Sequence, residues 1–264
     1  MVTVAAACEP PAPRADDSRL GQCRADPFVS GPVAALGPIA SAHHLTASVF
    51  DDRTGCWYRF RPGERVTTAS VVKVEIMAGT LLRAQNAGRN LTVGETALVT
   101  PMIHDSANAP ASSLWSGLGG VTGMSRVGDA FGLAATNEVG PVWGLTSTTA
   151  DDQAAFVEHL LQGPGPLDAG HRGLAWAFLR GVRPDQRWGV PAGVPDGWEV
   201  GNKNGFAGST CCGWRVNSVG YVADPAGGGY AVAILSDRWP NQAAGVPTVE
   251  TVARAVNAEL GAAG

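Results

Sequence analysis

The two lysines of the chain, Lys73 and Lys203, are the residues best suited to unusual chemistry. The 264 residues hold 19 lysines and arginines, and all but these two are arginines. Arginine stays charged in proteins, whereas a desolvated lysine can lose its proton and act as a base. Each lysine lies in a short polar motif, and a third motif, Ser106-Ala107-Asn108, falls between them.

Ser70 and Lys73 form a candidate nucleophile and base. We expect a helix over residues 70–87, and residues three apart on a helix share a face, so hydroxyl and amine can touch. A serine hydroxyl is a weak nucleophile until a neighbouring base takes its proton. A helix N-terminus adds free backbone N–H groups, which suit a developing oxyanion. Taken alone, this S-x-x-K spacing is more often a coincidence on an amphipathic helix.

The second motif follows a segment expected to be helical. The Ser106 hydroxyl can relay a proton to a leaving group, and the Asn108 amide can orient Lys73 and donate to a substrate carbonyl. Taken alone, the motif is more simply interpreted as a polar junction between a helix and a loop.

The third motif, Lys203-Asn204-Gly205, ends a run that is typical of a strand. Lys203 can hold a substrate carboxylate while it remains charged, and its charge would lower the pKa of Lys73. Gly205 lets the backbone approach a substrate closely. The backbone N–H of Phe206 is expected to pair with that of Ser70 as an oxyanion hole. A hairpin turn at Asn-Gly with an incidental lysine is the competing interpretation.

Strands are expected near both ends of the chain and helices between them. The predicted strands cover residues 45–50, 57–60, 198–203, 214–222 and 230–235. The predicted helices include residues 70–87, a segment capped by Thr92 and Glu95, residues 146–161 with Thr149 as a possible cap, and residues 248–260.

This order predicts an α/β (α+β) fold, in which an antiparallel sheet is flanked by helices and carries an inserted all-α lobe. We expect a flexible tail over residues 1–25 and one domain over residues 26–264. The α/β lobe would comprise about 26–69 and 195–264, the all-α lobe about 70–194, and a cleft would separate them.

Composition excludes several classes of function. The net charge is −4, and no basic stripe indicates nucleic acid. No apolar stretch is long enough to predict a membrane span.

The five cysteines, Cys8, Cys23, Cys56, Cys211 and Cys212, lack zinc-ligand spacing, so no metal site is expected. No other cofactor is expected either. A disulfide is possible, with the vicinal pair favoured to supply one partner and the connectivity left open. The cysteines and a trimmed-looking Ala5–Cys8 segment favour a secreted or cell-envelope protein, which we expect to be a monomer.

The three motifs in this order resemble those of the penicillin-recognising serine hydrolases, the family of class A β-lactamases and penicillin-binding proteins. The resemblance covers most of residues 27–262. More narrowly, Trp143-Gly144-Leu145-Thr146 and Lys203-Asn204-Gly205 resemble segments of the actinobacterial class A β-lactamase-related serine hydrolases. The resemblance implies a β-lactamase/transpeptidase-like fold and a small-molecule or peptide substrate with a carboxylate near the scissile bond. The implied catalytic residues are Ser70, Lys73, Ser106 and Lys203, and the implied substrate-binding residues are Asn108, Asn204, Gly205, Phe206 and Trp143.

Three departures from the family pattern affect the expected reaction. Asn204 stands where the pattern has Thr or Ser, and Ala107 where it usually has Asp. The Glu-x-x-x-Asn that activates the deacylating water is missing, because Glu138 has no Asn four residues later. Glu138 is either a solvated loop residue or a substitute for the missing water-activating glutamate. We therefore expect Ser70 to be acylated and hydrolytic release to be slow.

Two classes of function stay open at this point. The first is an acyl-serine hydrolase or transferase that acts on a β-lactam, a D-alanyl peptide, or another ester or amide. The second is a non-catalytic protein of the same fold that binds β-lactams or cell-wall peptides. The combination of Ser70 and Lys73 favours the first.

Overall fold

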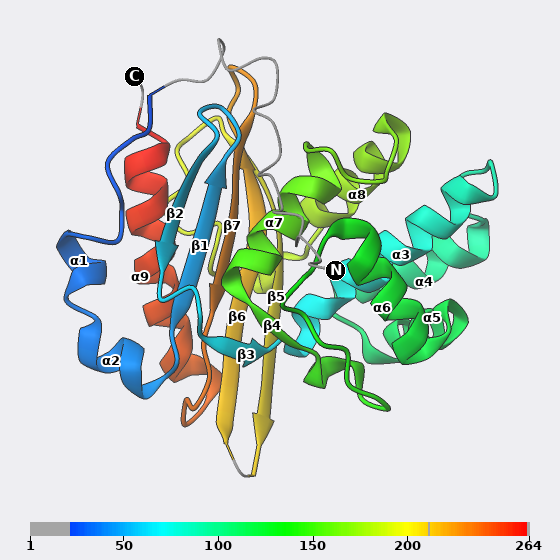
Figure 1. Cartoon of the computed structure of the whole chain (residues 1–264), viewed down its shortest axis with the longest axis horizontal. Helices are drawn as coiled ribbons and strands as arrows, with labels where there is room; N and C mark the ends of the chain where they lie inside the picture. Colours follow the sequence, from blue (N-terminus) through cyan, green and yellow to red (C-terminus); the bar gives the residue numbers. More distant parts are fainter. Residues whose placement is uncertain (1–21, 211, 263–264) are drawn as a thin grey trace, which may run out of the picture.

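Strands from both ends of the chain build one antiparallel sheet in this computed structural model, which describes residues 22–210 and 212–262 (Figure 1). The strand order is β2-β1-β7-β6-β5, and all neighbours are antiparallel. The strands are β1 (Thr46–Asp51), β2 (Cys56–Phe60), β5 (Glu199–Ser209), β6 (Gly213–Ala223) and β7 (Gly229–Leu235). The predicted sheet is confirmed.

Helices cover both faces of this sheet (Figure 1). On one face lies α9 (Gln242–Leu260), with the short helices α1 (Gly31–Ala34) and α2 (Gly37–Ala42) beside it. On the other lie α7 (Ala150–Leu161) and α8 (Ala169–Arg180). Each face buries its own apolar cluster, so the sheet is the layer between two cores.

The central helical region packs around α3 (Lys73–Asn86), which is buried along most of its length. Around it lie α4 (Val93–His104), α5 (Asn108–Leu118) and α6 (Gly120–Phe131). The predicted cap of α4 is confirmed: Thr92 and Glu95 form a reciprocal capping box, which satisfies two backbone N–H groups at the helix start. The Thr149 side chain likewise caps α7.

The helical segment that carries Ser70 begins differently from the prediction, which placed a helix over residues 70–87. Residues Ala69–Val72 form a 3-10 turn (η2), and the α-helix starts at Lys73. Ala69 has φ +48°, in the left-handed region that a side chain disfavours. Tertiary contacts hold the strained turn, since Asn217 Nδ2 donates to the carbonyls of Thr67 and Thr68 at 2.9 and 3.2 Å.

A small second sheet was not predicted. In it, β3 (Arg65–Thr67) pairs with β4 (Ser147–Thr149), where the sequence pattern suggested the start of a helix. Just beyond it, Thr68 N donates to Thr146 O at 2.9 Å. This pairing fastens residues 133–146, which we call the covering loop, beside the turn that carries Ser70. The covering loop includes the 3-10 turn η3 (Trp143–Leu145).

Strand β5 is longer than predicted and contains the third motif within it. It pairs with β6 from Glu199↔Ala223 to Ser209↔Gly213, so Asn204-Gly205 is not a turn. Helix α9 is also longer than predicted and begins after an Asn241 cap. In both cases tertiary pairing and capping outweigh local turn and proline signals.

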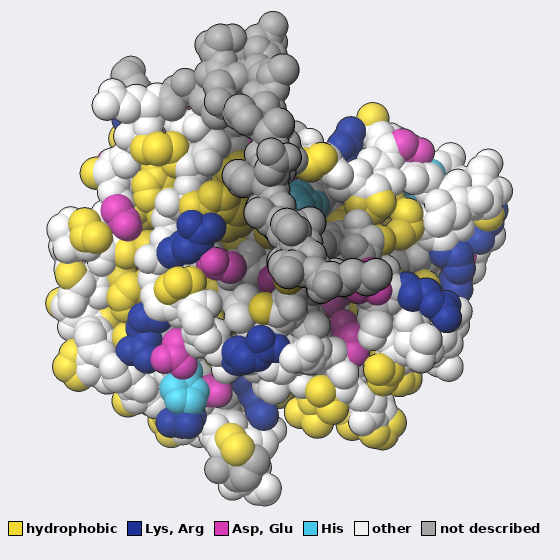
Figure 2. All heavy atoms as spheres, in the orientation of Figure 1, with side chains coloured by type: hydrophobic (Ala, Val, Ile, Leu, Met, Phe, Trp, Pro, Cys, Tyr) yellow, Lys and Arg dark blue, Asp and Glu magenta, His cyan; other side chains and the backbone are white. Residues whose placement is uncertain are grey.

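The N-terminal end of the described chain is held in place. A disulfide joins Cys23 to Cys56, and Arg24 N donates to Tyr58 Oη at 2.8 Å. Most of the predicted tail, together with Cys8 and Cys211, lies outside the described residues. Cationic and anionic side chains are interspersed on the face shown in Figure 2. None of the helices in the described part is long and apolar enough to cross a bilayer.

Candidate active site

Lys73 lies next to Ser70, as the spacing predicts. Its Nζ is 3.0 Å from Ser70 Oγ, 2.5 Å from the backbone carbonyl of Ser106 and 2.8 Å from Asn108 Oδ1. The two carbonyl oxygens can only accept hydrogen bonds, so they take two N–H groups of the amine. In the neutral amine the remaining lone pair can point at the Ser70 hydroxyl. The contacts therefore suit an amine that removes a proton from Ser70.

Burial makes the neutral form of Lys73 accessible. The side chain is fully buried, and this desolvation lowers its pKa to about 8. The Trp143 ring covers the amine, with its centroid 5.0 Å from Nζ. The indole N–H donates to Ser112 Oγ at 3.1 Å, which fixes the ring between α5 and the covering loop.

Ser106 lies between the two lysines. Lys203 Nζ donates to Ser106 Oγ at 2.9 Å and to Asn204 O at 2.8 Å, while Lys73 Nζ is 3.2 Å from the same hydroxyl. Ser106 itself has φ +55°, a second left-handed residue at the site. A hydroxyl between two amines can pass a proton from one to the other or to a leaving group.

Burial disfavours the charge that was expected on Lys203. The Lys203 side chain is buried. This desolvation holds the pKa of Lys203 well below its usual value, and the charge of Lys73 contributes a smaller part of the effect. The pKa of Lys73 is lowered by burial alone, without the contribution expected from the charge of Lys203.

A hollow of about 360 Å³ opens beside Ser70. Asn108, Trp143 and Phe206, three of the residues expected to bind substrate, also line it. The covering loop forms an apolar wall, in which Val142 and Leu145 are 52% and 40% exposed. Figure 2 shows hydrophobic side chains over the loop that precedes β4. One wall of the hollow is thus suited to an apolar group.

Arg215 is a site residue that the sequence did not reveal. It lies on β6 opposite Ala207, and it is the one charged side chain among the described residues that line the hollow. Its Nε donates to Thr67 Oγ1 at 2.7 Å, which orients the guanidinium. As one of many arginines it carried no local signal. Only the β5–β6 register places it opposite Ala207, two residues after the third motif.

Asn204 and Gly205 do not reach the hollow, contrary to expectation. Asn204 is fully buried, and its Nδ2 donates to the carbonyls of Gln186 and Trp188 at 2.7 and 3.1 Å, so its side chain is not available to a substrate. A Cβ added to Gly205 would lie 2.4 Å from Thr68 O and 2.8 Å from Val71 N. Gly205 therefore allows β5 to pass against the turn that carries Ser70.

Glu138 does not line the hollow beside Ser70. Its Oε2 accepts from Thr146 Oγ1 at 2.8 Å, and its carboxyl group also hydrogen bonds to Glu75 on α3. Burial raises its pKa, so the interpretation as a solvated loop residue is wrong. Glu138 lies instead at a hollow between α6 and the covering loop.

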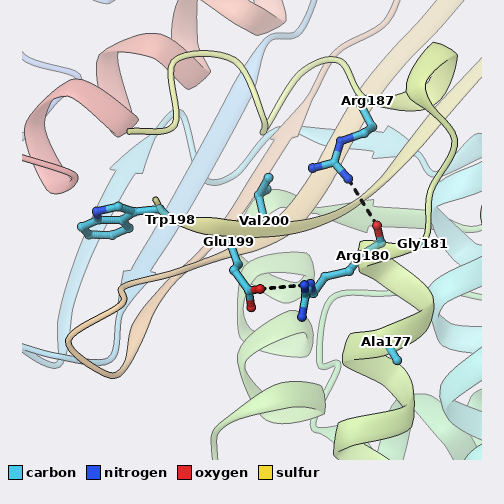
Figure 3. A pocket seen from close by; sticks show the side chains of 7 residues that line it. All are labelled: Ala177, Arg180, Gly181, Arg187, Trp198, Glu199 and Val200. Atoms are coloured by element: carbon cyan, nitrogen blue, oxygen red, sulfur yellow. Dashed lines mark hydrogen bonds and ion pairs between the residues drawn. The ribbon is translucent and has the colours of Figure 1, made fainter. Parts of the chain in front are cut away.

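A larger hollow, of about 520 Å³, lies between α8 and β5 (Figure 3). Its charged side chains are engaged within the protein: Arg180 pairs with Glu199 at 2.6 Å, and Arg187 donates to the backbone carbonyl of Arg180 at 3.2 Å. No serine, cysteine or lysine is among the described residues that line it. We therefore place the site at Ser70.

The comparison with family models decides the family. Residues 79–260 match the model described as the beta-lactamase enzyme family. The chain belongs to this family. The matched range contains Ser106 and Lys203 and begins after Ser70 and Lys73. The assignment of the first motif in this β-lactamase-family protein therefore rests on the geometry, in which Lys73 Nζ lies 3.0 Å from Ser70 Oγ.

Solved class A β-lactamases share the fold of this family member. A variant of the enzyme from the last common ancestor of Gram-negative bacteria is 23% identical, with a TM-score of 0.73 over 85% of this chain and 95% of that one. A β-lactamase from Desulfarculus baarsii is 22% identical, with a TM-score of 0.73 over 87% and 97%. One from Xanthomonas campestris is 20% identical, with a TM-score of 0.72 over 87% and 97%. No curated protein matches the chain.

Proposed function

We propose that the protein is a serine hydrolase or acyltransferase of β-lactamase type that forms an acyl-enzyme on Ser70. The observation that carries the proposal is the buried Lys73 amine, which lies 3.0 Å from Ser70 Oγ while two carbonyl oxygens occupy its N–H groups. A protein that only binds its ligand has no need for this arrangement.

In the acylation step, Ser70 Oγ attacks the substrate carbonyl while its proton moves to Lys73 Nζ. The backbone N–H groups of Ser70 and Phe206 are assigned to the oxyanion, because both residues line the same hollow. The bond to the leaving nitrogen or oxygen then breaks. Ser106 donates a proton to that atom and is reprotonated from the lysines on either side. The product is an ester on Ser70 and a neutral leaving group.

The lining of the hollow supports one class of substrate: a small molecule or peptide with a carboxylate near the scissile bond and an apolar group. Arg215 supplies the positive charge for the carboxylate, and the exposed Val142 and Leu145 supply the apolar wall. This assignment moves the carboxylate contact from Lys203, which is buried and does not line the hollow, to Arg215.

Hydrolysis of the acyl-enzyme is proposed to be slow. None of the described residues that line the hollow is acidic, and Glu138 is bonded to Glu75 and Thr146 away from it. Slow release leaves time for an amine acceptor, which favours transpeptidase activity. D-alanyl peptidase and esterase activities, which end in slow hydrolysis, also belong to this proposal. The Cys23–Cys56 disulfide supports an extracytoplasmic location, where such bonds persist. We also propose a monomer.

Turnover of nitrocefin tests the proposal and separates its forms. Sustained hydrolysis supports a β-lactamase, and a burst that stops near one equivalent supports a transpeptidase or a trapping protein. If nitrocefin is silent, a fluorophosphonate probe tests the nucleophile directly. Silence with both reagents would favour the non-catalytic binding protein.

A further inference from the structure

Two carboxyl groups meet inside the protein behind the covering loop. Glu75 lies on α3, two residues after Lys73, and its side chain is fully buried. Glu138 lies on the covering loop and is half-buried. The two side chains hydrogen bond to each other. A carboxylate can only accept, so one of the two must carry a proton for this bond to exist.

The remaining contacts leave one oxygen of each carboxyl group for this proton. Glu75 Oε1 accepts from Gln153 Nε2 at 2.9 Å, and Glu138 Oε2 accepts from Thr146 Oγ1 at 2.8 Å. The second oxygen of each, Glu75 Oε2 and Glu138 Oε1, is buried and receives no donor from the described side chains or backbone. A single proton between these two oxygens satisfies both.

The charged groups around the pair strengthen the hold on this proton. Burial, followed by the charge of Glu138, raises the pKa of Glu75 well above its usual value, and Asp152 on α7 adds to the effect. Burial also raises the pKa of Glu138. Asp129 of α6 is exposed at the hollow between α6 and the covering loop, which Glu138 also lines. The nearest cation along α3, Lys73, is engaged with Ser70, Ser106 and Asn108.

The covering loop links this pair to the active site. Five residues after Glu138, the Trp143 ring lies over the Lys73 amine. A Cβ added to Gly144 would lie 3.7 Å from Ala69 Cα, so the loop packs directly on the turn that carries Ser70. Thr146, which donates to Glu138, is also bonded to Thr68 through its carbonyl. A contact that fastens Glu138 therefore fastens one wall of the site.

We propose that one proton shared by Glu75 and Glu138 fastens the covering loop over Lys73, and that Glu75 is thereby a positioning residue for Trp143. Loss of the proton leaves two facing negative charges in a buried space, with Asp152 close by, and loosens the loop. The fastening itself is independent of the chemistry at Ser70. Its consequence, that a loosened loop admits water to an ester on Ser70, rests on the proposed function.

Amide hydrogen exchange of residues 133–146, measured by mass spectrometry from pH 6 to 9 and corrected for intrinsic rates, tests the fastening. In the wild type, protection of this peptide should fall as pH rises. Glu75→Gln and Glu138→Gln keep the size and a hydrogen-bond donor but carry no charge, so each should retain protection at least about tenfold above the wild type at the alkaline end. Asp129→Asn, at the same hollow, should follow the wild type.

Thermal unfolding provides a second readout that needs no activity. The folded pair holds a proton that the unfolded chain releases above about pH 4.5, so rising pH destabilises the wild type until the pair loses its proton. The melting temperatures of the two Gln variants should therefore rise relative to the wild type as pH increases. Equal pH dependence in the wild type and both variants, or opposite behaviour of the two variants, would overturn the proposal. An unreactive Ser70 would leave these results unchanged, so the two proposals fail separately.

Discussion

Lys73 Nζ and Lys203 Nζ lie 3.2 and 2.9 Å from the same atom, Ser106 Oγ. Two charged amines beside one hydroxyl in a buried site repel each other, which disfavours the state in which both amines are charged. Burial lowers the pKa of both, and for Lys203 the charge of Lys73 adds to the effect. The lowered pKa suits Lys73 to act as a base without help from a histidine or a carboxylate.

The first prediction concerns pH. Lys73 must be neutral to take the Ser70 proton, and burial lowers its pKa to about 8. The rate of Ser70 labelling by a fluorophosphonate should thus rise about tenfold per pH unit below pH 8 and level off above it. Stopped labelling reactions analysed by intact mass measure this rate. A rate that stays flat or falls between pH 6 and 8 would argue against Lys73 as the base.

A second prediction concerns Arg215. Arg215→Gln should lower kcat/KM for an ester that carries a carboxylate by roughly 10- to 100-fold, because a charged hydrogen bond is lost. The matched neutral ester should change little. Arg180→Gln, in the other hollow of Figure 3, serves as the control and should affect neither. Equal losses on both esters would show that Arg215 only supports Thr67.

A third prediction concerns Gly205. In Gly205→Ala the new methyl group meets Thr68 O at 2.4 Å and Val71 N at 2.8 Å, so the turn that carries Ser70 must shift. We expect a loss of about 1–3 kcal/mol in unfolding free energy and roughly 100-fold slower labelling. Gly63→Ala is the matched control, since no atom lies within 4 Å of its added Cβ. Labelling at the wild-type rate in Gly205→Ala would contradict the positioning role.

The disulfide gives a fourth prediction. Cys23 and Cys56 are 33 residues apart, and a cross-link of this span stabilises a protein by about 3–4 kcal/mol through the unfolded chain. The double variant Cys23→Ser, Cys56→Ser should lose most of this in urea unfolding, while labelling of Ser70 in the folded fraction continues. An unchanged unfolding free energy would show that the N-terminal segment adds no stability.

Sequence patterns predicted what local spacing determines. They gave the pairing of Ser70 with Lys73, the caps at Thr92 and Thr149, and a sheet built from both ends of the chain. They could not predict features that depend on contacts between distant segments. The charge of Lys203 depends on burial, and the direction of Asn204 depends on carbonyls from the loop before β5.

The carboxyl pair shows the same limit. Glu75 lies in the first turn of α3, where a negative charge is normally favourable. Only packing against α7 and the covering loop buries it beside Glu138. Arg215 likewise becomes a site residue only through the β5–β6 register.

The intact mass of the folded protein after treatment with penicillin or a fluorophosphonate tests the central claim, that Ser70 forms an acyl-enzyme with Lys73 as its base. We expect a single adduct that maps to Ser70, no adduct in Ser70→Ala, and labelling slowed on the order of 10³-fold or more in Lys73→Ala, because nucleophile and base act as a unit. No adduct with either reagent, or an adduct that persists in Ser70→Ala, would contradict the account.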